Sequence, residues 1–163
     1  MSVKERLDVE LLEDDYDDED TQEDKFLTFI LSKEEYGIEI RYVTEIVGIQ
    51  NITQVPDMPD FIKGVINLRG KVIPVMDVRL RFDIEERPYD DRTCIVVINI
   101  NEQAVGLIVD RVSEVLDIPK TEIELPPKIR RSERINFIQG LGKVGDKVKI
   151  LLNANKLLYE EEE

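Results

Sequence analysis

Arg69 is the residue of this sequence whose type and setting most clearly suggest a chemical task. It stands in the NLRG turn of the stretch FIKGVINLRGKVIPVMD (61–77), between two runs rich in β-branched residues. A guanidinium can hold a carboxylate through two parallel hydrogen bonds, and Glu45 is an available carboxylate in the segment RYVTEIVG (41–48). Composition alone favours a simpler interpretation, in which Arg69 is a solvated hairpin tip.

The residue types on which most enzymes rely are missing or isolated. With no histidine in 163 residues, the sequence offers no imidazole base, no Ser-His or Cys-His pair and no histidine metal ligand. Its one cysteine, Cys94, lies in the apolar run TCIVVINI, which is typical of a small core residue, and a lone thiol fits a reducing compartment. We therefore expect no catalytic residues, no cofactor and no metal site.

Two patterns that resemble catalytic or binding motifs have simpler interpretations. GLGKVG (140–145) matches the dinucleotide signature G-x-G-x-x-G, but a strand pattern follows where that signature needs a helix, so we interpret it as a glycine-rich hairpin. Paired carboxylates could support hydrolysis, so an enzyme built on small barrels stays an alternative. The acidic residues inside the fold have the spacing of solvated strand and turn faces, namely Glu39, Glu45, Asp110 and Glu114.

The charge of the chain is concentrated in its ends. Residues 1–25 hold twelve acidic and three basic side chains, residues 160–163 are four glutamates, and the net charge of −14 leaves −1 for residues 26–159. Few apolar positions and dense like charge predict a disordered acidic tail over 1–25 and an acidic C-terminal tail over 160–163. A nearly neutral folded part argues against binding to nucleic acid. No run reaches the roughly 18 apolar residues of a membrane span, so we expect no direct membrane insertion.

A hairpin and a short helical turn are predicted before the NLRG turn. FLTFILS and EEYGIEI are β-rich runs around the polar connection 32–35, which indicates a hairpin. In RYVTEIVG, the apolar spacing predicts a short helical turn that carries Glu45 and ends at Gly48.

Two strands and a second short helix are predicted around and after the NLRG turn. VINL and KVIPVMD have the composition of strands, and Pro74 marks an edge or a bulge. Asp77 is placed to cap a short helix formed by VRLRF.

The same order of predicted elements occurs twice in the sequence. When the sequence is shifted along itself so that Gly37 meets Gly106, YGIEIRYVTEIV falls on VGLIVDRVSEVL, and a slightly larger shift, after extra residues around PPKIRRS, places FIKG on FIQG. The repeats, over about 26–82 and 95–159, predict two small barrels of about five strands, one from each copy, with a groove along their seam. The second copy has no counterpart of Arg69, which favours a role for this arginine on one half only.

Several blocks of the sequence, taken in order, match one protein family. EEYGIEI, VTEIVG and above all MPDFIKGVINLRGKVIPVMDVRLRF carry the match, and VGLIVDRVSEVL and FIQGLGKVGDKVKILLN continue it over about residues 26–159. In these blocks the chain resembles the chemotaxis coupling proteins of the CheW family. The resemblance implies a mainly β fold of two intertwined five-stranded SH3-like β-barrels with a few short helices.

The resemblance also implies a function and partners. Such proteins are non-enzymatic adaptors of a two-component system, which scaffold the contact between chemoreceptors and a histidine kinase. The implied partners are the cytoplasmic signalling tip of a chemoreceptor and the regulatory domain of the kinase. We accordingly expect a cytoplasmic protein that is recruited to membrane receptor clusters and is a monomer on its own. Kinase contact is implied for the end of one barrel, without assigned residues.

Receptor contact carries over from the resemblance onto Val43, Glu45, Gly64, Arg69 and Val115. Glu45 and Arg69 match a charged pair of the family, and we expect Arg69→Ala to cause an intermediate loss of stability. At Gly64 the backbone is expected to turn tightly or to meet another chain segment, and Gly64→Asp to weaken receptor binding more than folding.

One further alternative comes from the same resemblance. The chain could be the regulatory domain of a larger histidine kinase, because that domain shares the fold. The sequence contains no histidine for phosphotransfer and no nucleotide-binding motif, which favours the adaptor.

Overall fold

The computed structural model describes residues 22–126 and 136–159. The elements with bounds inside these residues are strands, two short α-helices and two 3-10 turns. The strands of the first repeat are β1 (Lys25–Leu31), β2 (Glu34–Glu39), β3 (Val43–Gly48), β4 (Ile62–Leu68) and β5 (Lys71–Asp77). Those of the second are β6 (Cys94–Ile100), β7 (Gln103–Val109), β8 (Arg111–Asp117), β9 (Ile123–Glu124), β10 (Ile138–Val144) and β11 (Lys147–Leu152). The helices are α3 (Val78–Arg81) and α4 (Ala154–Tyr159), and the 3-10 turns are η1 (Ile40–Tyr42) and η2 (Lys120–Glu122).

The first contacts of the fold lie one or two residues before the predicted boundary at residue 26. Lys25 opens β1 and lies 3.5 Å from the carboxylate of Asp117, and the N–H of Ile118 donates to the carbonyl oxygen of Asp24 at 2.8 Å. Residues 1–21 of the predicted disordered tail over 1–25, and the predicted tail over 160–163, lie outside the described residues.

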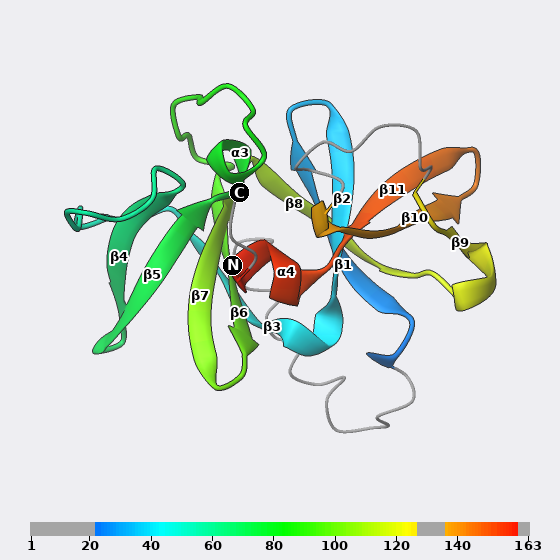
Figure 1. Ribbon diagram of the computed structural model, residues 1–163, viewed down its shortest axis with the longest axis horizontal. Helices are drawn as coiled ribbons and strands as arrows, with labels where there is room; N and C mark the ends of the chain where they lie inside the picture. Colours follow the sequence, from blue (N-terminus) through cyan, green and yellow to red (C-terminus); the bar gives the residue numbers. More distant parts are fainter. Residues whose placement is uncertain (1–21, 127–135, 160–163) are drawn as a thin grey trace.

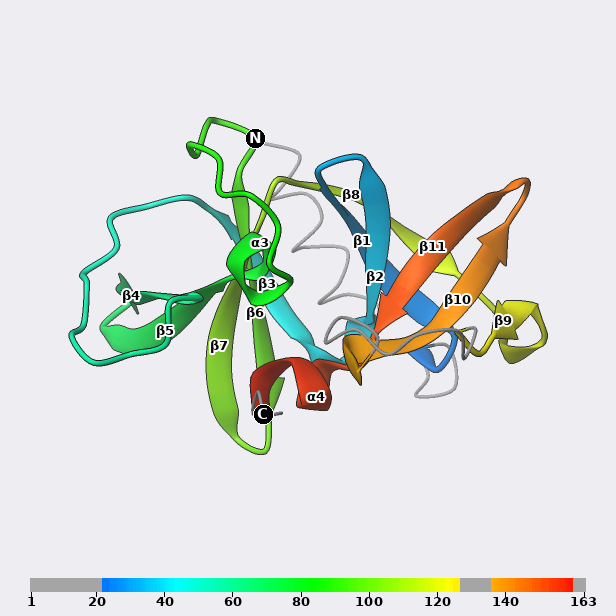
Figure 2. The same ribbon diagram turned by 45° about the horizontal axis from the view of Figure 1, so that its top comes forward.

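The strands form two sheets that lie side by side (Figure 1). One sheet has six strands in the order β8-β1-β2-β11-β10-β9, and the other has five in the order β3-β6-β7-β5-β4. In Figure 1 the five-stranded sheet lies on the left, the six-stranded sheet on the right, and α4 between them, and the turned view in Figure 2 keeps this arrangement. The predicted mainly β fold of two barrel-like halves with a few short helices is confirmed, with β9 as an extra two-residue strand.

Each sheet contains strands from both repeats. The first repeat places β1 and β2 in the six-stranded sheet but β3, β4 and β5 in the other, and the second repeat makes the reverse exchange with β6 and β7. Two parallel pairs, β2 with β11 and β5 with β7, join the repeats within a sheet. The prediction that each copy builds one barrel by itself is therefore wrong, and the intertwined arrangement implied by the family resemblance is present.

The two repeats match down to their irregularities. The β4–β5 ladder shifts register between Ile62 and Gly64, and the β10–β11 ladder shifts between Ile138 and Gly140, the equivalent positions of the second repeat. The short β9 pairs with β10, and the corresponding contact of the first repeat is a single bridge between Thr53 and Val65. These matched bulges show that the sequence repeat is a structural repeat.

The segment that carries Glu45 is a strand, so the predicted helical turn is wrong. The 3-10 turn η1 covers only Ile40–Tyr42, and the residues from Val43 to Gly48 pair with β6. β-branched residues fill this segment (Val43, Thr44, Ile46 and Val47), and they are stiff in helices and pack well on pleated strands. Gly48 ends the strand, as it was expected to end the helical turn.

The predictions for Asp77 and Pro74 are confirmed. The side chain of Asp77 accepts a hydrogen bond from the N–H of Arg79 at 2.9 Å and so caps α3. Pro74 pairs with Val65 of β4, but the pairing of β5 with β7 starts only at Val75, so Pro74 has a neighbouring strand on one side only.

The main core is shared by both repeats and continues across the seam between the sheets. It includes Leu27 and Ile38 from the six-stranded sheet and Val96 and Leu107 from the five-stranded sheet. Smaller clusters lie within each half. Because one core unites the halves, we expect them to unfold together.

Candidate functional site

The predicted pair of Glu45 and Arg69 is present in the structure. Nη2 of Arg69 donates a hydrogen bond to Oε2 of Glu45. Glu45 lies on β3 and Arg69 in the turn between β4 and β5, and β3 and β4 are the two edge strands of the five-stranded sheet. The ion pair therefore links the two edges of this sheet.

The pair is more exposed on its arginine side than expected. The side chain of Glu45 is 21% exposed and that of Arg69 is 69% exposed. An exposed ion pair contributes about 0–1 kcal/mol, because water screens the charges and both side chains lose conformational freedom. The intermediate loss of stability expected for Arg69→Ala is thus reduced to a small one, and the pair is better suited to presenting charge than to holding the fold together.

The turn that carries Arg69 has an unusual backbone. Arg69 has φ +52° and Gly70 has φ +83°, so both central residues of the hairpin turn have positive φ. A positive φ is unfavourable for a residue with a Cβ, and glycine is the usual choice. The second repeat has Gly145 at the position of Arg69, with φ +63°. The first repeat thus places an arginine where the second has a glycine.

Gly64 is buried beneath another chain segment, so the predicted close approach of the backbone at this residue is confirmed. Its φ is +148°, and a Cβ on it would lie 2.1 Å from the carbonyl oxygen of Thr53. Thr53 and Val65 exchange two backbone hydrogen bonds at this point, of 2.8 and 2.9 Å. Gly140 of the second repeat also lies beneath a neighbouring segment, but less tightly, because a Cβ on it would lie 2.6 Å from a side-chain carbon of Ile123 and 3.1 Å from the carbonyl oxygen of Glu124. Gly64 therefore shapes the site by letting the chain before β4 close over the strand, and we now expect Gly64→Asp to damage the fold.

The two valines assigned to receptor contact lie on different sheets. Val43 opens β3, two residues before Glu45, and is half-buried against the main core. Val115 lies on β8, the edge strand of the six-stranded sheet, and is also half-buried against that core. The structure brings Glu45 and Arg69 into contact and places Val43 on the same strand as Glu45, whereas Val115 belongs to the other half.

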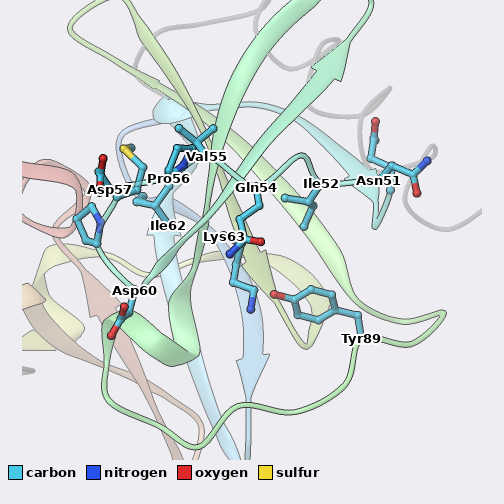
Figure 3. A pocket seen from close by; sticks show the side chains of 13 residues that line it. Asn51, Ile52, Gln54, Val55, Pro56, Asp57, Asp60, Ile62, Lys63 and Tyr89 are labelled. Carbon is cyan, nitrogen blue, oxygen red and sulfur yellow. The ribbon is translucent and has the colours of Figure 1, made fainter.

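An open groove of about 610 Å³ lies beside the five-stranded sheet (Figure 3). The chain from Gln50 to Asp60, with Ile62, Lys63 and Tyr89, lines it. The rim includes the exposed apolar side chains of Val55 and Met58. Lys63 is paired with Glu86 at 2.5 Å. The groove is wide and mostly polar, unlike the enclosed and mostly apolar sites that hold small molecules.

The expected groove along the seam stays a prediction, and a smaller pocket lies in the half formed by the six-stranded sheet. It has a volume of about 350 Å³ and lies where β2, β10, β11 and the end of α3 meet. Its lining residues are Glu34, Tyr36, Phe82, Ile138, Ile150 and Leu152.

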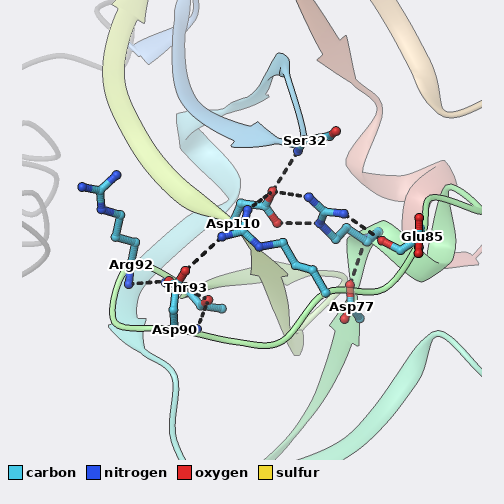
Figure 4. Close-up of polar contacts among 9 residues, drawn as sticks. Ser32, Asp77, Glu85, Asp90, Arg92, Thr93 and Asp110 are labelled. Atoms are coloured by element: carbon cyan, nitrogen blue, oxygen red, sulfur yellow. Dashed lines mark hydrogen bonds and ion pairs between the residues drawn. The ribbon is translucent and has the colours of Figure 1, made fainter.

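A buried ion pair between Arg79 and Asp110 joins the two halves (Figure 4). Nε and Nη2 of Arg79 donate to the two carboxylate oxygens of Asp110, both at 2.7 Å. Nη1 donates to the carbonyl oxygen of Glu85 at 2.7 Å. The N–H of Ser32, in the β1–β2 turn of the other sheet, donates to the same carboxylate at 2.8 Å. The prediction that Asp110 lies on a solvated face is wrong, because its side chain is only 9% exposed.

The environment of Asp110 keeps its carboxylate charged. Burial alone would raise the pKa of Asp110, but the hydrogen bonds from Arg79 and Ser32 and the charges of Arg79 and Arg87 hold it below its ordinary value. The hydrogen bond to Asp110 raises the pKa of Arg79 above its ordinary value. The pair links α3 of one repeat to the β7–β8 corner of the other, and no spacing along the sequence predicts that these two residues meet.

No helix within residues 22–126 and 136–159 is long and apolar enough to cross a membrane. In the same ranges, no three His, Cys, Asp or Glu side chains are grouped so as to hold a metal ion.

Comparisons with known proteins identify one family. The model of the CheW-like domain matches residues 25–162. A chemotaxis protein CheW from Klebsiella aerogenes is 41% identical over 138 residues, covering 85% of this chain and 83% of the relative. A chemotaxis protein CheW from Bacillus subtilis is 33% identical over 138 residues, covering 85% and 88%. The crystal structure of the scaffolding protein TtCheW from Thermoanaerobacter tengcongensis aligns with a TM-score of 0.76 at 40% identity, covering 83% of this chain and 88% of that one.

Proposed function

This chain belongs to the CheW-like domain family, and we propose that it couples chemoreceptors to a chemotaxis histidine kinase. Its function is that of a chemotaxis adaptor, in keeping with relatives named chemotaxis protein CheW and a structural neighbour described as a scaffolding protein. The finer proposal is that one surface binds the cytoplasmic signalling tip of a receptor while another binds the regulatory domain of the kinase.

The observation that carries the receptor part is the charged pair on one half only. Arg69 reaches Glu45 across the edges of the five-stranded sheet, and the equivalent turn of the second repeat has Gly145 instead. The exposed guanidinium keeps donors free for a partner, because an arginine has five N–H groups. We propose that Val43, Glu45 and Arg69 contact the receptor, that Gly64 shapes this surface from below, and that Val115 contributes from the neighbouring sheet.

The kinase contact is proposed for a different surface, at the end of one barrel-like half. The kinase's regulatory domain is expected to share this fold, so a barrel end of one protein can meet a barrel end of the other. We further propose that the protein is cytoplasmic, is a monomer on its own, and is recruited to membrane receptor clusters through its partners. A reducing compartment suits Cys94, the one cysteine of the sequence, whose buried thiol donates to the carbonyl oxygen of Arg92 and forms no intrachain disulfide.

The protein is proposed to act by binding and not by catalysis. Support comes from the scaffold role of the family and from a sequence without histidine. The alternative, an enzyme that uses paired carboxylates for hydrolysis, would need two convergent acids. Asp110, the most buried of the four acids named in the sequence analysis, is already bound to Arg79.

A three-component pull-down tests the proposed function. The full chain is immobilised and offered a receptor signalling-tip fragment, the kinase regulatory domain, or both. We expect each to bind alone and both to bind together. Failure of both partners to bind a correctly folded chain would contradict the adaptor function, and mutual exclusion would contradict the two-surface proposal.

A further inference from the structure

The turn that presents Arg69 is fastened by one neighbouring side chain. Oδ1 of Asn67 accepts a hydrogen bond from the N–H of Gly70 at 2.8 Å. Asn67 is the last residue but one of β4, is exposed, and lies outside the Glu45–Arg69 contact. In the second repeat Lys143 occupies the equivalent position, and an ammonium group cannot accept a hydrogen bond.

This hydrogen bond fixes the peptide group between Arg69 and Gly70. Two-residue hairpin turns occur as types I′ and II′, which differ mainly by a flip of that central peptide. Positive φ at both Arg69 and Gly70 is the pattern of type I′. In the second repeat Gly145 has a positive φ and Asp146, which is also among the described residues, does not, which is the pattern of type II′.

The choice of turn decides whether an arginine can stand there. The first central position of a type II′ turn needs a backbone conformation that is open almost only to glycine, whereas type I′ needs the left-handed region, which other residues adopt at a cost. A side chain that holds the central peptide in the type I′ orientation therefore makes the position usable for arginine. It also fixes the direction in which the Cβ of Arg69 leaves the backbone, toward Glu45.

We propose that Asn67 is a positioning residue, which locks the turn so that Arg69 reaches Glu45 and faces the receptor. The proposal rests on the proposed receptor contact of Arg69 and adds the residue that prepares it. The positive φ of Arg69 strains the first-repeat turn, whereas the second repeat has a glycine at that position. Backbone strain of this kind is often retained at functional sites.

Matched variants at the two equivalent positions test this role. Asn67→Ala removes the acceptor, Asn67→Asp keeps an oxygen in its place, and Lys143→Ala is the control in the second repeat. Receptor signalling-tip affinity is measured by titration calorimetry, and exchange of the Gly70 amide proton by NMR. We expect Asn67→Ala to weaken receptor binding about three- to tenfold, the factor of one lost hydrogen bond, and to speed Gly70 exchange. Asn67→Asp and Lys143→Ala should keep affinity within about twofold of the unmodified protein.

The outcomes separate this inference from the proposed function. Arg69→Ala is measured alongside, and if it binds the receptor normally, both the contact and the inference built on it are wrong. If Arg69→Ala loses binding while Asn67→Ala binds normally, the contact stands and the positioning role is refuted. Equal losses in Asn67→Ala and Asn67→Asp would also refute it, because the hydrogen-bond acceptor would then not be the reason. Melting curves of all variants confirm that the exposed substitutions leave the fold intact.

Discussion

Phe61 and Phe137 occupy equivalent positions of the two repeats and hold the guanidinium of Arg81 between their rings. The centre of the guanidinium lies 4.4 Å from the ring centroid of Phe61 and 4.5 Å from that of Phe137. Nε of Arg81 donates to the carbonyl oxygen of Leu157 in α4 at 2.9 Å. The buried guanidinium of Arg81, from the first repeat, thus contacts the FIKG segment, the FIQG segment and the C-terminal helix α4.

Arg81→Ala is predicted to destabilise the protein by roughly 2–4 kcal/mol, because it removes two desolvated cation–π contacts and a buried hydrogen bond. Arg41→Ala is the control, since Arg41 lies over Tyr42 at 4.7 Å but its side chain is 57% exposed. That change should cost about 0–1 kcal/mol. Urea denaturation measures both, and equal effects would show that Arg81 does not join the repeats.

Asp110→Asn is predicted to cost roughly 3–5 kcal/mol at neutral pH, because it leaves the buried Arg79 without its charged partner. The Asp117→Asn control removes a carboxylate that is 70% exposed and should change stability by about 0–1 kcal/mol. A loss for Asp110→Asn no larger than that of the control would contradict the role given to the buried pair.

The same variant makes a prediction about pH. Folding lowers the pKa of Asp110, so its contribution is fully present above the ordinary aspartate value of about 3.9 and is lost as the pH falls through the lower folded pKa. The stability difference between the unmodified protein and Asp110→Asn should therefore be constant from neutral pH down to about pH 5 and shrink below about pH 4. Denaturation curves at a series of pH values measure it, and a difference that grows on acidification would have the wrong sign.

Gly64→Ala is predicted to destabilise the protein by roughly 2–4 kcal/mol, because the added Cβ strains the backbone and collides with the carbonyl of Thr53. Gly70→Ala is the matched control, with φ +83° but no atom within 4 Å of the added Cβ. It should cost about 1 kcal/mol from backbone strain alone. If both variants unfold at the same denaturant concentration, the close packing of Gly64 against Thr53 is not what requires glycine.

Removal of residues 1–21 is predicted to leave the melting temperature unchanged, whereas removal of residues 1–25 should lower it. The second deletion takes away Lys25 and the backbone of Asp24, which bind Asp117 and Ile118. Calorimetry on the two truncated chains measures the difference. Equal melting temperatures would mean that these contacts add nothing to the fold.

The sequence predicted which segments form strands better than it predicted which strands pair with one another. Aligning the two copies correctly paired β1 with β6 and β5 with β11 as equivalent strands, because hydrophobic pattern and glycine positions are local properties. Which sheet each strand joins depends on contacts between segments that are far apart in the sequence. No local pattern in the sequence therefore predicts that the two repeats exchange strands. For the same reason the family resemblance, and not the pattern, supplied the intertwined arrangement.

The candidate site was predicted unevenly. The absence of Arg69 from the second copy was visible in the sequence and led to the pair with Glu45, but its exposure was not. Glu45 was placed on a helical turn because the apolar spacing of a short segment fits both a helix and a strand, and pairing with β6 decided it. Asn67 could have been noticed, since asparagine two residues before the first turn position is well placed to bond the turn backbone.

A double-mutant cycle of Glu45→Ala and Arg69→Ala, measured in receptor affinity and in stability, tests the proposed receptor contact most directly. The two charges touch, so we expect a coupling in receptor binding of roughly 1 kcal/mol or more but a stability cost of only about 0–1 kcal/mol for either change, with kinase binding retained. Lysine at position 69 should rescue incompletely, because it lacks the planar fork of arginine. The exposed pair of Lys143 and Glu124 in the second half, at 3.5 Å, is the control and should show no effect on receptor binding. Additive losses for Glu45 and Arg69, or equal losses for the control pair, would contradict the claim that the Glu45–Arg69 pair, which only the first repeat has, is central to receptor contact.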